Sequence, residues 1–336
     1  METNTNLLNV VNRNCIICNS TEYNSIFTLS DDYNNFFDNS NKDSVKLNSI
    51  YGPQKIVECK NCGCCYVKNV VMGITTNSNE LHERENEERE KCILEENKLH
   101  VENLIKKKFY DPILYKLNNA IRFSKKNPED MFFFDYGSGT GYVNKLSEIL
   151  GFKKSYAFDP VYNVKTQESF NKSGFKNIES FGDIDALKEK KIKFDIIWCT
   201  AVIEHALSPK KLIEDLVEIS HQDTIFVFSN PLMPIKKDAP EMKKILIRKD
   251  YEEIKELRRK KRYMHFHLNH INFMGGKQIK LLLDEFNISV IRFYPNTFIN
   301  KKFNFKMNPL SNFLKKIYIF IFPYTERSDY FLKRRR

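Results

Sequence analysis

The chain has 336 residues, 41% of them hydrophobic and 13% aromatic, which is enough apolar material for one large domain with an appendage or for two domains. Lys and Arg number 54 against 43 Asp and Glu, a formal net charge of +11. Residues 1–14 are polar and Asn-rich, and the apolar stretch Ile317–Phe322 is too short to cross a bilayer, so we expect a cytoplasmic protein without a signal peptide or membrane span.

The first predicted module is built around cysteines. The chain has eight cysteines, and without a secretion signal these favour metal binding or reduced thiols over disulfides. Two C-x2-C motifs, Cys15/Cys18 and Cys59/Cys62, are separated by 40 residues. Four thiolates from two such turns make a closed tetrahedral zinc site. We therefore predict a zinc ribbon over 1–75, in which Cys15, Cys18, Cys59 and Cys62 bind an architectural Zn²⁺ ion.

A helical linker or cap is expected next, over 76–128. The segment Asn79–Phe109 is rich in charge, lacks Gly and Pro, and spaces its apolar residues as in an imperfect helix. Asp111 and Pro112 open a second helix that runs to about Lys126, with Pro at the first helical position.

The most informative segment is Met131–Val143, with the sequence MFFFDYGSGTGYV. Its apolar run ends in Asp135 and is typical of a buried parallel strand. Glycines follow at 137, 139 and 141, and helical spacing begins at Tyr142. A strand, a glycine turn and a helix N-terminus form a cradle for a ligand, because the backbone can approach closely and free N–H groups point outward. Tyr142 stands where a dinucleotide-binding G-x-G-x-x-G loop needs its third glycine.

Further strands follow in the order that a parallel sheet requires. Ser155–Phe158 is followed by Asp159, 22 residues after Gly137, where an acid is placed to bind ribose hydroxyls. Phe194–Thr200 precedes the segment AVIEHALSPKKLIEDL, and Thr224–Phe228 is predicted as the fifth strand. Strands that alternate with helices imply a parallel sheet, and ligands bind at the carboxyl ends of its strands.

Two of these segments resemble motifs of the class I S-adenosylmethionine-dependent methyltransferases. D-x-G-x-G-x-G at 135–141 resembles motif I, and FDIIWCT with the later Glu204-His205 pair resembles motif IV, where such a pair starts the next helix. The resemblance implies an α/β fold with a Rossmann-like seven-stranded methyltransferase sheet over 129–296, an N-terminal zinc ribbon and a helical cap. It also implies S-adenosylmethionine as cofactor. The residues that would bind this donor are Asp135, Gly137, Gly139, Gly141, Asp159 and Asp183.

Two histidines are candidates for the general base. Methyl transfer to a hydroxyl or to a keto-sugar carbon needs a proton acceptor, and histidine suits that task near neutral pH. His205 belongs to the segment that resembles motif IV, and His270 opens an H-I-N-F segment that resembles one late in the family. A helix cap or a hydrogen-bonded polar residue is the alternative for each.

The arrangement of motifs narrows the expected acceptor. Two C-x2-C motifs ahead of motif I are similar to the sugar-modifying methyltransferases of antibiotic-sugar and surface-polysaccharide pathways. This resemblance implies O- or C-methylation of a saccharide or nucleotide-linked sugar. The C-methyltransferases among them carry a further C-terminal domain, whereas we expect the sheet to end near Tyr294, with 42 residues after it. Two alternatives stay open: an RNA methyltransferase, and a non-enzymatic zinc-ribbon interaction protein with a degenerate donor fold.

The excess positive charge is regional. Residues 236–336 hold 25 Lys and Arg against 10 Asp and Glu, whereas the first 235 hold 29 against 33. We expect a lid insertion at about 236–272 and a basic aromatic tail at 297–336. This region could attract a nucleotide-sugar pyrophosphate, a nucleic acid or an anionic membrane, and a solvated helix is the alternative. For the tail, docking on the protein body is the default, with membrane contact or subunit pairing as alternatives. The oligomeric state stays open.

Overall fold

The computed structural model describes residues 10–29, 54–71, 98–107, 111–160, 163–230, 271–295 and 328–335. These residues fall into two compact units. Unit 1 comprises the described parts of 1–78, 204–210 and 231–282, and unit 2 comprises those of 79–203, 211–230 and 283–336.

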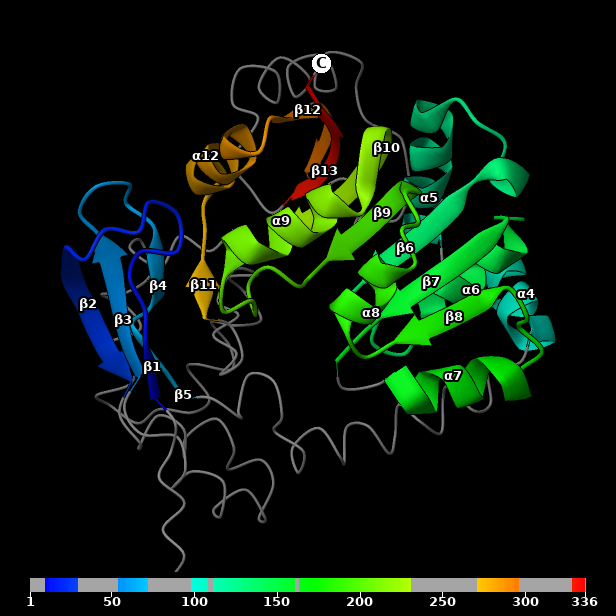
Figure 1. The fold of residues 1–336 in the computed structure, drawn as a ribbon, viewed down its shortest axis with the longest axis horizontal. Coiled ribbons are helices and arrows are strands. Elements are labelled where there is room, and N and C mark those ends of the chain that lie inside the picture. The colour runs from blue at the N-terminus through cyan, green and yellow to red at the C-terminus, as the bar shows by residue number, and fades with distance from the viewer. Residues whose placement is uncertain are drawn as a thin grey trace, which may run out of the picture. The chain divides into compact units, whose positions relative to one another are not determined.

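Unit 2 is built on a seven-stranded sheet with the strand order β12-β13-β10-β9-β6-β7-β8 (Figure 1). The strands are β6 (Phe132–Tyr136), β7 (Lys154–Phe158), β8 (Ile178–Phe181), β9 (Phe194–Thr200), β10 (Ser220–Asn230), β12 (Ile288–Pro295) and β13 (Ser328–Arg334). Strands β10, β9, β6, β7 and β8 are parallel, whereas β13 is antiparallel to both of its neighbours. The predicted α/β fold with a seven-stranded sheet is therefore confirmed.

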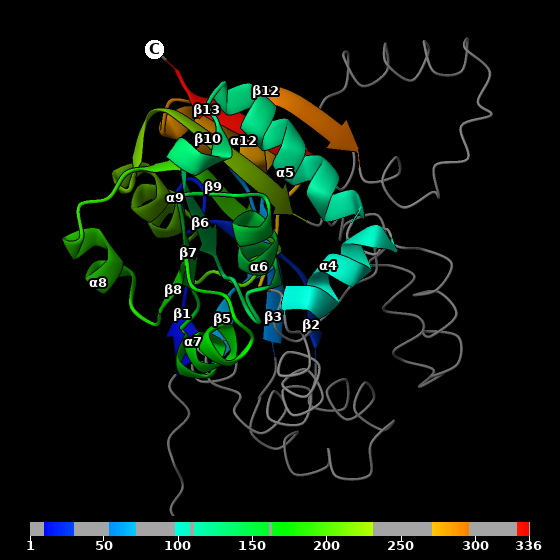
Figure 2. The same ribbon diagram turned by 90° about the vertical axis from the view of Figure 1, so that its right-hand side faces the viewer.

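Helices cover both faces of this sheet. They are α4 (Lys98–Lys106), α5 (Asp111–Ser124), α6 (Tyr142–Ile149), α7 (Asn163–Lys172), α8 (Ile184–Glu189) and α9 (Pro209–Glu218), whereas most of α12 (Gly276–Glu285) belongs to unit 1. In Figure 2, α4, α5 and α6 lie on one face, and α8 and α9 lie on the other. Phe133 and Phe134 are both fully buried, so β6 faces apolar material on both sides, as expected for a central parallel strand.

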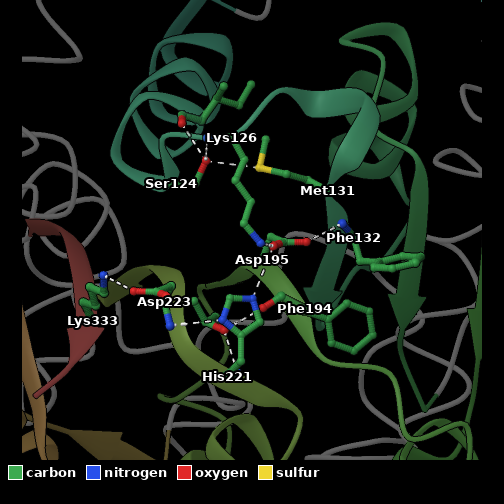
Figure 3. A network of polar contacts seen from close by, with 11 residues as sticks. Ser124, Lys126, Met131, Phe132, Phe194, Asp195, His221, Asp223 and Lys333 are labelled. Atoms are coloured by element: carbon green, nitrogen blue, oxygen red, sulfur yellow. Dashed lines mark hydrogen bonds and ion pairs between the residues drawn. The ribbon is translucent and has the colours of Figure 1, made fainter. Parts of the chain in front are cut away.

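The amino ends of the two central strands are joined by a buried carboxylate (Figure 3). Asp195, on β9, accepts hydrogen bonds from Phe132 N at 2.8 Å, from Lys126 Nζ at 2.5 Å and from His221 Nε2 at 3.2 Å. His221 Nδ1 accepts from Asp223 N at 3.0 Å, so Nε2 carries the proton that it shares with Asp195. This network fixes the starting points of β6 and β9, whose opposite ends lead into the candidate site.

Strand β13 lies in the segment for which the sequence indicated a basic aromatic tail, so the sheet extends past residue 296. Tyr330, Phe331 and Leu332 are at most 1% exposed. Three consecutive buried residues show that the strand is covered on both faces, and such a strand lacks the alternation of polar and apolar residues that marks a half-exposed one. The rest of the tail lies outside the described residues.

Two helix boundaries differ from the expected ones. The Glu204-His205 pair does not start a helix: both residues lie in a turn, and α9 begins only at Pro209, whose fixed φ suits a first helical turn. Of the long helix expected at 79–109, α4 is the described part. Among the described residues, no helix is long and apolar enough to cross a bilayer.

Unit 1 contains a four-stranded sheet with the order β11-β4-β3-β2 and a separate pair formed by β1 and β5. The strands are β1 (Val10–Asn12), β2 (Tyr23–Leu29), β3 (Gln54–Cys59), β4 (Cys65–Val67), β5 (Asn69–Val71) and β11 (Asn272–Phe273). Strand β11 joins this sheet from about two hundred residues further along the chain, with Asn272 opposite Tyr66 and Phe273 opposite Cys65. The expected lid at 236–272 lies outside the described residues, except for its last two positions.

Candidate functional site

The glycine turn connects β6 to α6 and is held against the end of β7. Gly137 N and Ser138 N both donate to Phe158 O, at 2.8 and 3.0 Å. Gly139 N donates to the carboxylate Oδ2 of Asp159 at 3.0 Å. The turn and the acid after β7 therefore lie together, as the sequence predicted for the carboxyl ends of adjacent parallel strands.

Glycine is favoured at the three positions of the turn for different structural reasons. A Cβ at Gly137 would lie 2.5 Å from Val202 Cγ2, and one at Gly141 would lie 2.2 Å from Phe170 Cζ. Packing therefore leaves no room for a side chain at either position. A Cβ at Gly139 would meet nothing within 4 Å, although its φ of +52° favours glycine. Gly139 is therefore the position where the turn faces open space.

Two carboxylates shape the electrostatics beneath the turn. Asp135 is 2% exposed, and burial together with the nearby negative charge of Asp159 raises its pKa well above the usual value. Asp159 is also buried, at 9% exposed, and its Oδ2 accepts from the turn. The site thus combines a buried carboxyl that retains its proton more readily with a second carboxylate at the turn.

Asp183, which the resemblance assigned to the donor, follows β8 and caps a helix. Its Oδ1 accepts from Asp185 N at 3.0 Å at the start of α8, and the residue is exposed. This is an ordinary N-cap. Asp135, Gly137, Gly139, Gly141 and Asp159 lie together, and donor contact stays a prediction for these five residues as for Asp183.

In unit 1 the four predicted cysteines come together. The Sγ atoms of Cys15, Cys18, Cys59 and Cys62 all lie within 4.8 Å of one another. Cys15 is 3.5 Å from Cys62, and Cys18 is 3.5 Å from Cys59. Tetrahedral zinc with Zn–S bonds of about 2.3 Å separates its sulfur ligands by about 3.8 Å, so the cluster has the dimensions of a metal site.

The shifted pKa values of two of these thiols also favour a bound cation. Hydrogen bonds from Cys62 and Cys64 lower the pKa of Cys15, and the resulting charge, with burial, raises the pKa of Cys62. Ionisation of Cys15 therefore disfavours ionisation of Cys62, and a bound cation would relieve the repulsion between such thiolates.

His205 lies half-buried in the turn after β9, next to the buried Glu204. Glu204 O accepts from Ile271 N at 2.9 Å and from Asn272 N at 3.1 Å. The His205 loop is therefore attached to the strand β11 of unit 1. His270 lies outside the described residues, and its role stays a prediction.

Sequence reasoning missed Arg13 and Asn272, whose side chains bind this loop. Arg13 Nη1 donates to Leu207 O at 3.3 Å, and Asn272 Nδ2 donates to Ala206 O at 2.6 Å. Neither residue belongs to a periodic pattern. The available signals were that Arg13 precedes the first cysteine motif by two positions and that Asn272 belongs to the H-I-N-F segment.

Comparison with known proteins places these features in a family. A family model described as a methyltransferase domain matches residues 115–292. A search of curated proteins finds no match. Among solved structures, the chain is similar to the YcgJ protein from Bacillus subtilis, with 13% identity, a TM-score of 0.43 and coverage of 66% of this chain and 99% of that one.

Two further solved structures show the range of similar proteins. PKMT2 from Rickettsia typhi, in complex with AdoHcy, is 16% identical with a TM-score of 0.44, over 66% of this chain and 52% of that one. The ribosomal protein L11 methylase from Lactobacillus delbrueckii subsp. bulgaricus is 14% identical with a TM-score of 0.35, over 65% and 77% of the two chains.

Proposed function

Because the matched domain spans more than half of its residues, the chain belongs to the methyltransferase-domain family, and we propose that it methylates a saccharide or nucleotide-linked sugar. The chain is an S-adenosylmethionine-dependent methyltransferase. The acceptor, the base and the metal are the proposed parts. The single observation that carries the donor assignment is the hydrogen bond from Gly139 N to Asp159, which brings the glycine turn and the acid into one site.

The residues of this site fit the donor. The turn is open at Gly139, where a Cβ would meet no atom within 4 Å, and α6 begins directly after Gly141. Asp159 offers carboxylate oxygen to ribose hydroxyls, and the amino end of a helix favours the negatively charged part of a ligand. The family resemblance assigns Asp183 to the adenine, and we retain that assignment as part of the proposal.

The chemistry required of the protein is modest. When bound, S-adenosylmethionine supplies a methyl group on a good leaving group. The protein then has to align the acceptor with that methyl and remove a proton from the acceptor. We assign the proton removal to His205, because it follows β9 by five residues and its loop is held by backbone hydrogen bonds. His270 is the second candidate.

The cysteine module supports a sugar acceptor. The order of two C-x2-C motifs followed by the glycine turn is similar to that of sugar-modifying methyltransferases, and the four Sγ atoms have the spacing of a metal site. We propose that Cys15, Cys18, Cys59 and Cys62 bind Zn²⁺ as a closed, architectural site. Such a site stabilises a small sheet that has little core of its own.

Methyl transfer from labelled S-adenosylmethionine to a panel of nucleotide sugars, free saccharides and total RNA tests the acceptor. We expect label in a sugar product. His205→Asn should lower the rate by about a hundredfold or more, the usual contribution of a general base, while S-adenosylhomocysteine binds normally. His100→Asn, an exposed histidine on α4, is the matched control and should leave the rate unchanged.

Label in RNA with none in any sugar would refute the proposed acceptor and support the RNA alternative. Full activity in His205→Asn would refute the proposed base. Failure to bind S-adenosylhomocysteine in a calorimeter would contradict the donor site itself.

A further inference from the structure

A buried arginine connects the cysteine-bearing sheet to the loop that carries His205. Arg13 is 7% exposed and lies two residues before Cys15, the first residue of the metal-binding motif. On the sheet side, its Nε and Nη2 donate to Val67 O at 3.1 and 2.7 Å. The guanidinium also lies 5.7 Å from the ring centroid of Tyr66. Arg13 is thus fixed to β4, which follows directly after the second cysteine motif.

The remaining donors of Arg13 reach segments that are distant in sequence. Nη2 donates to Ile271 O at 2.7 Å, and Nη1 donates to Asn272 Oδ1 at 2.8 Å and to Leu207 O at 3.3 Å. All five N–H groups of the guanidinium are therefore used. A lysine, with a single nitrogen, could not span the same acceptors.

Asn272 completes the connection. Its Nδ2 donates to Ala206 O at 2.6 Å, and its backbone N donates to Glu204 O at 3.1 Å. The carbonyl groups on both sides of His205 are therefore held by one residue of β11. Because Asn272 Oδ1 accepts from Arg13, the orientation of this amide is set by the arginine.

Arg13 is a buried charged residue, and this favours a role beyond stabilising the fold. The guanidinium of arginine is charged at neutral pH in proteins, and this one is 7% exposed. Its five described hydrogen bonds go to four neutral acceptors, three backbone carbonyl oxygens and one side-chain amide oxygen. A buried charge with neutral partners is costly compared with an apolar residue, and such groups serve best where they specify one geometry.

We propose that Arg13 is a positioning residue, which holds the Glu204–Leu207 loop on the metal-binding sheet so that metal loading of the cysteine cluster sets the orientation of His205. The proposal rests on the proposed function in so far as His205 is the base. The metal would then act on the reaction without touching donor or acceptor.

The test uses the full chain with Arg13→Gln and Asn272→Ala. Amide hydrogen exchange is measured over 203–207, and the pH titration of the His205 ring is followed by NMR, with His205→Gln to assign the resonance. We expect about tenfold faster exchange and a shifted titration in both variants, since each loses hydrogen bonds to the loop. Removing the metal from the unmodified chain should give the same changes, and removing it from Arg13→Gln should add little.

Lys55→Gln is the matched control, because Lys55 lies 4.8 Å from the Tyr23 ring on the same sheet and hydrogen-bonds that residue. It should leave the loop and the His205 titration unchanged. Bound metal and S-adenosylhomocysteine affinity should stay within about twofold in every variant, as expected when the lost interactions belong to neither site.

Unchanged exchange and an unchanged His205 titration in Arg13→Gln would overturn the proposal. If Arg13→Gln also loses its metal, Asn272→Ala decides, because it removes the bond to Ala206 and leaves the cysteine motifs intact. Activity in His205→Gln would refute His205 as the general base and would leave the proposed link between the metal and the 204–207 loop standing. If His205→Gln is inactive but metal removal does not change the 204–207 loop, only the proposed role of Arg13 is refuted.

Discussion

The carboxylate of Asp159 accepts a hydrogen bond from Gly139 N at 3.0 Å, and this contact joins the end of β7 to the glycine turn after β6. The two residues are 20 positions apart in the chain, and both follow strands whose carboxyl ends meet at the same edge of the sheet. The contact fixes the position of the turn relative to the acid. Several properties of the protein depend on it.

Asp159→Asn should weaken donor binding. The amide can still accept from Gly139 N, but it loses the charge that ribose hydroxyls bind most strongly. We expect S-adenosylhomocysteine affinity to fall by about 10- to 100-fold, as for a hydrogen bond to a charged group. Calorimetric titration measures this, and Glu168→Gln, an exposed acid on α7, is the control. Equal affinity in Asp159→Asn and the unmodified chain would contradict the assignment.

Gly141→Ala should mainly lower the stability of the fold, whereas Gly139→Ala should mainly lower the affinity for the donor. At Gly141 the new Cβ would lie 2.2 Å from Phe170 Cζ, so we expect a loss of about 1–3 kcal/mol in the free energy of unfolding. At Gly139 the Cβ meets no atom of the described residues within 4 Å, so the stability loss should be limited to about 1 kcal/mol of backbone strain, while donor affinity falls sharply.

Urea unfolding followed by tryptophan fluorescence measures both variants, because Trp198 on β9 is the only tryptophan of the chain and reports on unit 2. A Gly139→Ala variant that binds S-adenosylhomocysteine normally would show that the open side of the turn does not face the donor.

The glycine turn and the acid beside it could be predicted because their signal is local, and their contact with the donor stays proposed. Asp135 and the three glycines lie within seven consecutive residues, and Asp159 follows the next strand. The cysteine cluster was also predictable, since each motif forms its own turn and only two turns have to meet; its geometry is confirmed, and its metal stays proposed.

The rest of the site depends on contacts that no local pattern records. Strand β11 is two residues long, and its pairing with β4 spans about two hundred positions. The loop at 204–210 and the C-terminal strand β13 are likewise defined by distant partners. Such contacts are set by packing and hydrogen bonding in the folded chain, and they leave no periodicity in the sequence.

The stability of unit 2 should fall as pH rises, through Asp135. Burial and the charge of Asp159 raise its folded pKa, so the folded state binds a proton that the unfolded state releases above about pH 4. Stability from this group is present at low pH and is lost, at up to about 1.4 kcal/mol per pH unit, until the pH reaches the folded pKa.

Asp135→Asn should remove this slope and stabilise the protein at neutral pH. Trp198, which lies opposite Asp135 in the register of β6 and β9, reports the unfolding. Asp159→Asn should lower the folded pKa of Asp135 and so narrow the pH range over which stability falls. A stability curve that does not differ between Asp135→Asn and the unmodified chain above pH 4 would contradict this account.

Metal removal should act on the cysteine module. The purified chain should contain about one zinc ion, as four thiolates form one closed site. Cys59→Ser should lose the metal and accelerate hydrogen exchange in β3 and β4, because binding free energy is folding free energy in such a sheet. Elemental analysis and hydrogen exchange measure this. Cys65→Ala, outside the cluster, should keep its metal; retention of zinc by Cys59→Ser would exclude this ligand set.

Asp195→Ala should destabilise unit 2 without affecting donor binding. The substitution leaves Phe132 N and the His221 ring without their acceptor, and we expect a loss of about 2–3 kcal/mol. Asp195→Asn should cost less, since its oxygen can still accept from Phe132 N. Both effects appear in urea unfolding followed at Trp198.

The position of Asp195 explains why binding should be spared. It lies at the amino end of β9, whereas the glycine turn follows the carboxyl end of the neighbouring β6. S-adenosylhomocysteine affinity in the folded variant should therefore equal that of the unmodified chain. A large loss of affinity in Asp195→Asn at full folding would mean that the two ends of these strands are energetically coupled, which would contradict this prediction.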